Sequence, residues 1–138
     1  MSQDPKSVVR RFVEEFQTQN KIETADELIA DDFVNHSSMG LPPNKEGVKQ
    51  LFAIFRVAFP DLRAEIHEQL VDGEKVTTRK TFYGTHKGDF MEIPPTGKPV
   101  SIGVIDIVRV VDGKMKEHWN QVDQFGLMQQ LGVVPTPG

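Results

Sequence analysis

A long apolar run near the C-terminus constrains the fold more than any other feature of this chain. Residues 100–111, VSIGVIDIVRVV, are almost continuously apolar and rich in β-branched side chains, which favours a largely buried strand. The dipeptide Asp112-Gly113 that follows is typical of a two-residue hairpin turn. Residues 114–124 therefore form the return strand, and the pair predicts a β-hairpin.

The predicted turn sets which side chains of this hairpin face the core. A two-residue loop pairs Val111 with Lys114 and Asp106 with Trp119. Since successive side chains point to opposite faces of a strand, we expect one face to combine Ile102, Val104, Asp106, Glu117, Trp119, Gln121 and Asp123. A carboxylate on an apolar face is costly to bury unless it is paired, hydrated or used in function.

Helical spacing of apolar side chains predicts three helices in the N-terminal half, over about 5–19, 24–30 and 45–59. The first begins at Asp4-Pro5, where an N-cap residue precedes a proline. Pro60 ends the third, because the residue before a proline disfavours the helical region.

From residue 62 the period changes to that of strands, and residues 62–71 and 74–85 predict another hairpin. A Gly/Pro-rich segment over 86–99 still carries Phe90 and Met91, which suggests a flap packed over a pocket. Helices followed by antiparallel strands indicate one α+β domain over 1–138, with a pocket between the helices and a curved sheet. A short last helix is expected over 125–131, and 133–138 as a loose tail.

Composition and motifs exclude several classes of function. The formal charge of −4 and the absence of a basic cluster argue against nucleic-acid binding, and the chain has no cysteine for a disulfide or a thiolate site. No apolar stretch reaches the length of a membrane span and the N-terminus lacks the apolar core of a signal peptide, so a cytoplasmic protein is expected. The four histidines lack metal-ligand spacing, and no phosphate or dinucleotide loop occurs, so neither metal nor cofactor is expected.

Two carboxylates are the main candidates for chemistry. An apolar pocket would raise the pKa of Asp123 and suit it to acid–base catalysis. Asp123 could instead cap the last helix or pair with an arginine at the end of the strand. Asp106 could share that pocket, or form a salt bridge to Arg79 or Lys80, or accept a hydrogen bond from Trp119. These alternatives stay open on the sequence alone.

His36 is the histidine that we expect at the pocket mouth, whereas His118 has the opposite parity to Trp119 and should lie on the other face. Helical spacing makes Phe55 a core residue first and a ligand contact second. The expected substrate contacts are Trp119, Gln121, Phe55, Phe90 and Met91.

The order of elements and several segments resemble the SnoaL-like polyketide cyclases, or ester cyclases, of the nuclear transport factor 2-like superfamily. The segments are 8–16, 30–36, 58–63, 84–100, 105–119 and 123–132, of which IPPTGKPV and DGK…EHW are the most specific. The resemblance implies a cone-shaped α+β barrel with a deep pocket, often in a dimer.

The resemblance also implies cofactor-free aldol closure of a polyketide ester by an aspartate on the last long strand. Asp123 is the match for that residue, with His36, Asp106, Trp119 and Gln121 lining the pocket. The alternative is a protein that binds an apolar small molecule in the same pocket without catalysis. We also expect a homodimer through the sheet, because Ile105, Ile107 and Val111 form an apolar row on its other face.

Overall fold

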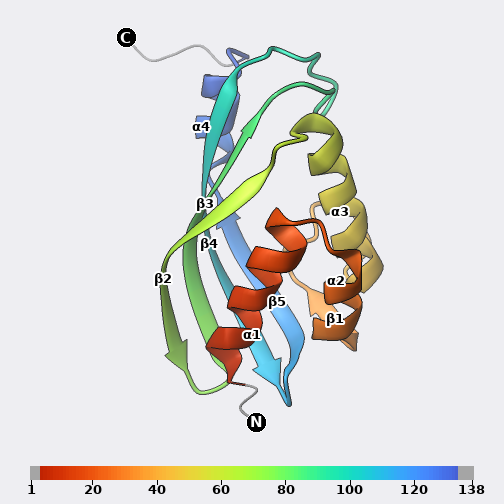
Figure 1. The fold of residues 1–138 in the computed structure, drawn as a ribbon, viewed down its shortest axis with the longest axis vertical. Coiled ribbons are helices and arrows are strands. Elements are labelled where there is room, and N and C mark those ends of the chain that lie inside the picture. The colour runs from red at the N-terminus through yellow and green to blue at the C-terminus, as the bar shows by residue number, and fades with distance from the viewer. Residues whose placement is uncertain (1–3, 134–138) are drawn as a thin grey trace.

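The computed structural model describes residues 4–133, in which a curved sheet wraps around three helical segments (Figure 1). The elements are α1 Pro5–Arg11, the π-helical η1 Phe12–Thr18, α2 Ile22–Leu28, β1 Ile29–Asn35, α3 Lys45–Ala58, β2 Arg63–Asp72, β3 Lys75–Thr85, β4 Pro99–Val111, β5 Lys114–Val122 and α4 Gln124–Gln130. The predicted α+β class is confirmed. Residues 134–138, which include most of the expected loose tail, lie outside the described residues.

The predicted helix signals act where they were expected. Asp4 caps α1 by accepting a hydrogen bond from the Ser7 amide at 3.0 Å, and α1 runs directly into η1. Asn44 caps α3 by accepting from the Gly47 amide at 3.1 Å. The N-cap residues satisfy amides that would otherwise lack partners, which fixes the helix starts.

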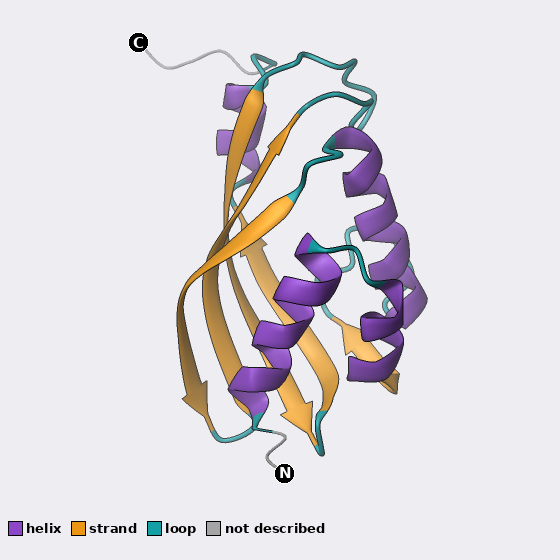
Figure 2. Cartoon of the chain, viewed as in Figure 1, coloured by secondary structure: helices purple, strands orange, loops and turns teal. Residues whose placement is uncertain are grey.

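The five strands are ordered β1-β5-β4-β3-β2 in one curved sheet that does not close (Figure 2). Neighbouring strands from β2 to β5 are antiparallel, whereas the edge strand β1 runs parallel to β5. A parallel pair requires a long crossover, and here the chain between the two strands supplies α3 and the other three strands. The helices pack on the concave face, where Phe16, Phe52 and Phe82 form part of the core.

The last hairpin contains a β-bulge, so its predicted register holds only next to the turn. Next to the turn, Val111 pairs with Lys114 as predicted, but Lys116 is an extra residue in β5. Beyond it Asp106 lies opposite Asn120, so the predicted pairing of Asp106 with Trp119 is wrong. A shift of one residue moves every later side chain of the strand to the other face.

The segment 86–98 closes over one end of α3, as the predicted flap should. The amides of Lys87 and Gly88 donate to the carbonyl oxygen of Ala58 at 3.0 and 3.2 Å. Phe90 is buried, and its ring lies 5.4 Å from that of Phe59. The flap is therefore a packed part of the core.

Replacing Gly88 with alanine should loosen this contact. A Cβ atom there would lie 2.0 Å from the carbonyl oxygen of Val57, so the backbone of the flap or of α3 must move. We expect Gly88→Ala to lower the free energy of unfolding by about 1–3 kcal/mol, measured by urea denaturation. Gly103→Ala is the matched control, since no atom lies within 4 Å of the added Cβ. Equal stability of the two variants would contradict the close approach.

Candidate functional site

A cavity of about 100 Å³ lies between the concave face of the sheet and the helices. Most of its lining is apolar, and it includes Phe55, Phe90 and Met91, the three side chains predicted there. The polar residues that line it are Gln17, Asn35, Ser37, Lys80, Asp106, His118, Asn120 and Gln124. Asp106 is the carboxylate within this lining, so the chemistry of the cavity centres on it.

Asp106 forms a buried ion pair with Lys80. The Lys80 Nζ atom lies 2.8 Å from Asp106 Oδ2, and the two side chains are only 2% and 4% exposed. Lys80 Nζ also donates to Gln17 Oε1 at 3.0 Å, which ties the pair to η1. The alternative that Asp106 pairs with Lys80 is thus confirmed, and so is its place on the core face.

Opposing effects set the pKa of Asp106. Burial disfavours the charged form and would raise the pKa of this carboxyl group, but the ammonium of Lys80 and the neighbouring His118 favour the charge. The second effect is larger, so the pKa of Asp106 lies below its ordinary value of 3.8. The carboxyl group is therefore ionised at neutral pH.

His118 also lines the cavity, so its predicted place on the other face of the sheet is wrong. Its Nε2 atom lies 3.7 Å from Asp106 Oδ2, and its Nδ1 atom lies 2.9 Å from Asn35 Oδ1. The Ser37 amide also donates to Asn35 Oδ1 at 3.0 Å, so this atom is an acceptor. Nδ1 therefore carries a proton, and the other ring nitrogen, Nε2, faces the carboxylate of Asp106.

Asp123 lies outside the cavity, so its predicted place in the pocket is wrong. Its Oδ1 atom accepts a hydrogen bond from the Gly126 amide at 2.9 Å, and the side chain is exposed. Asp123 is the N-cap of α4, which was the alternative reading of this residue. Trp119 and Gln121 also face away from the cavity, because the bulge at Lys116 reverses the parity of β5.

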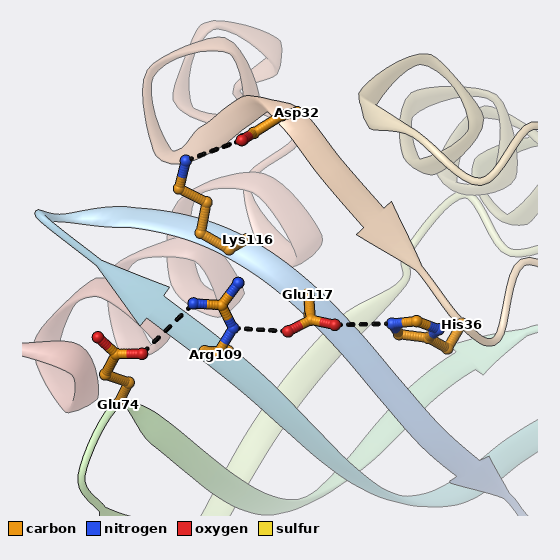
Figure 3. Close-up of polar contacts among 6 residues, drawn as sticks. All are labelled: Asp32, His36, Glu74, Arg109, Lys116 and Glu117. Carbon is orange, nitrogen blue, oxygen red and sulfur yellow. Dashed lines mark hydrogen bonds and ion pairs between the residues drawn. The ribbon is translucent and has the colours of Figure 1, made fainter.

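His36 belongs to the outer face of the sheet rather than to the pocket mouth. Its ring stacks on Trp119 with centroids 4.7 Å apart, and Nε2 lies 3.0 Å from Glu117 Oε2. Figure 3 shows how Arg109 continues this chain of contacts from Glu117 to Glu74. The hydrogen bond from Arg109, and then that from His36, holds the pKa of Glu117 below its ordinary value.

Candidate metal clusters and membrane-spanning helices are both absent from the described part of the chain. Residues 4–133 hold no cluster of three or more histidine, aspartate or glutamate side chains suited to a metal ion. In the cavity itself, the ammonium of Lys80 occupies the position beside Asp106 and would repel a cation. None of the helices in this range is both long and apolar enough to span a bilayer.

The ion pair makes a prediction about stability and pH. Asp106→Asn should lower the free energy of unfolding at neutral pH by about 3–5 kcal/mol, because it leaves the charge of Lys80 buried without a partner. The folded-state pKa of Asp106 lies below the unfolded value, so its stabilising effect is complete above the unfolded pKa and is lost as the pH falls through the folded one.

Urea denaturation of both proteins across the acid range checks this prediction. The difference in unfolding free energy between wild type and Asp106→Asn should shrink once the pH drops below about 4. A difference that stays constant down to acid pH would show that the carboxylate charge contributes nothing.

Sequence comparison relates this chain to known polyketide cyclases. The SnoaL-like polyketide cyclase family matches residues 7–131. The aklanonic acid methyl ester cyclase DauD of Streptomyces sp. (strain C5) is 30% identical over 138 residues, covering 94% of this chain and 83% of DauD. The nogalonic acid methyl ester cyclase of Streptomyces nogalater is 29% identical over 116 residues, covering 81% of this chain and 86% of that protein.

Solved structures agree with the sequence comparison. IdmH from Streptomyces antibioticus superimposes with a TM-score of 0.84 at 34% identity, covering 94% of this chain and 99% of IdmH. TsrD from Streptomyces laurentii superimposes with a TM-score of 0.85 at 25% identity, covering 94% of this chain and 95% of TsrD. With a family match over nearly the whole chain, this protein belongs to the SnoaL-like polyketide cyclase family.

Proposed function

We propose that this chain closes a ring in a small carbonyl-containing polyketide ester by acid–base catalysis without a cofactor. The observation that carries the proposal is the meeting of an ionised Asp106 and the Nε2 atom of His118 in an apolar cavity. Two relatives named as methyl ester cyclases of polyketide acids support the substrate class.

In this proposal His118 moves the proton. In the neutral form that carries its proton on Nδ1, the Nε2 atom accepts a proton from the carbon next to a substrate carbonyl, which leaves an enolate. The enolate carbon attacks a second carbonyl carbon of the same molecule, a carbon–carbon bond forms, and the resulting alkoxide takes the proton back from Nε2. Asn35 holds Nδ1 in its protonated form, and the charge of Asp106 stabilises the transient imidazolium.

We therefore assign the acid–base role to the pair of His118 and Asp106 instead of to Asp123. A base must reach the proton that it removes, within hydrogen-bond distance or through one water. Asp123 caps α4 outside the cavity, whereas His118 and Asp106 both line it. Asp106 alone is a weak acceptor, because Lys80 keeps its pKa low.

Kinetics of two variants test this assignment, with aklanonic acid methyl ester as the probe. We expect His118→Gln to lower kcat by about 10²–10⁴-fold, the usual contribution of a positioned acid–base group. Asp123→Asn should change kcat by less than about threefold, because asparagine caps a helix as well as aspartate does. If His118→Gln kept the wild-type kcat, His118 would not be the base. If Asp123→Asn showed the loss of about 10²–10⁴-fold instead, Asp123 would be the base.

Binding without catalysis is the competing function of the same cavity, and its largely apolar lining favours that reading. A wild-type protein that binds the methyl ester and releases it unchanged would support binding alone.

We further propose that two copies associate through the outer face of the sheet. Ile105 on β4 is 50% exposed there, next to the half-buried Ile107 in the predicted apolar row. On the same face Leu70 of β2 is 64% exposed. Burying such side chains against a second copy would remove apolar surface from water.

Sedimentation at micromolar concentration tests this association. Wild type should sediment as a dimer, and Ile105→Glu should shift the population to monomer, because the new charge would be desolvated in the interface. Ile54→Glu is the control, since Ile54 is similarly exposed but lies on α3, which covers the other face. A wild type that is entirely monomeric, or an equal effect of both variants, would contradict the proposal.

A further inference from the structure

One oxygen of the buried ion pair has no partner. Asp106 Oδ1 is inaccessible to solvent and accepts no hydrogen bond within residues 4–133. Three other buried polar atoms share this condition, namely Arg56 Nε, Gln69 Oε1 and His86 Nε2. Of the four residues, only Asp106 lines the cavity. A buried acceptor without a donor costs free energy, so the donor missing here can come from what the cavity binds.

Lys80 offers the complementary group. Its ammonium has three N–H donors, and the described residues place two acceptors on them, Asp106 Oδ2 at 2.8 Å and Gln17 Oε1 at 3.0 Å. The ring of Phe82 lies 5.2 Å from Nζ and provides only a weak contact for the third. The ion pair therefore holds one spare acceptor and one spare donor side by side.

We infer that this pair binds a hydroxyl group adjacent to a carbonyl group of the substrate. The hydroxyl donates to Asp106 Oδ1, and the carbonyl oxygen accepts from Lys80 Nζ. The chemical class is an enol of a 1,3-dicarbonyl or a phenol beside an acyl group, which presents both functions together. This inference rests on the proposed function, because it names the unit of the polyketide ester that the cavity recognises.

The charges make such a site selective. In solution the adjacent hydroxyl and carbonyl form one neutral hydrogen bond to each other. In the cavity they would exchange it for two hydrogen bonds to charged groups, which are stronger. A ligand with only the carbonyl leaves Asp106 Oδ1 unpaired, and an isomer with a distant hydroxyl cannot fill both positions. The order of affinities among isomers therefore reports on this contact.

Binding of three unreactive probes, measured by titration calorimetry, tests the inference without requiring turnover. The probes are 1-hydroxy-2-acetonaphthone, with the hydroxyl beside the acetyl group, 6-hydroxy-2-acetonaphthone, with the hydroxyl remote from it, and 2-acetonaphthone. We expect wild type to bind the first about tenfold more tightly than either of the others.

The variant Lys80→Met/Asp106→Leu should lose this preference. It removes both charges together, so it avoids the unpaired charge that a single substitution leaves buried, and circular dichroism checks that it folds. The matched control is Lys116→Met/Asp32→Asn, which removes the exposed ion pair of Figure 3 and should keep the preference. No preference in wild type, as expected if water fills the site, or a preference that survives in the cavity variant, would overturn the inference.

The outcome separates this inference from the proposed function. Turnover of the methyl ester without any preference among the probes refutes the inference alone. A preference that depends on the ion pair, in a protein without turnover, supports the recognition and refutes the proposed catalysis.

Discussion

The buried ion pair between Lys80 and Asp106 is the interaction on which the site depends. Removing two charges from water costs several kcal/mol for each ion, and only a close partner and further hydrogen bonds offset that cost. Here the partner lies 2.8 Å away, and Gln17 of η1 supplies the further bond. The pair therefore joins β3, β4 and η1 at one wall of the cavity. It places two fixed charges in a lining that is otherwise largely apolar.

The bulge in β5 decides which residues share that space. The Asp112-Gly113 turn fixes the register only up to the first irregularity, and the extra residue Lys116 follows almost at once. The sequence carries a signal of this bulge, because the apolar residues Met115 and Val122 of β5 are an odd number of positions apart. Both line the cavity. Strict alternation cannot place both inward, so one residue between them had to be accommodated outside the ladder.

Features encoded by local chemistry were predicted, whereas those set by distant pairing were not. Asn44 caps the start of α3, and Pro60 ends this helix through backbone sterics. Apolar flap residues such as Phe90 line the cavity as expected. His36 was misplaced because its side follows from β1, which lies parallel to β5 after a long crossover. That pairing directs Asn35 inward and His36 outward, and no local pattern specifies it.

The same ion pair that makes the carboxylate tolerable in the cavity also limits what the carboxylate can do. A carboxyl group whose pKa is held low by an ammonium remains ionised, so it is a poor proton acceptor and a good source of fixed negative charge. In the proposed mechanism, proton transfer then falls to a neighbour, and Asn35 and Ser37 orient the ring of His118 so that Nε2 faces Asp106. The division of roles in the proposed mechanism follows from electrostatics, because the group that supplies charge and the group that exchanges the proton need opposite properties.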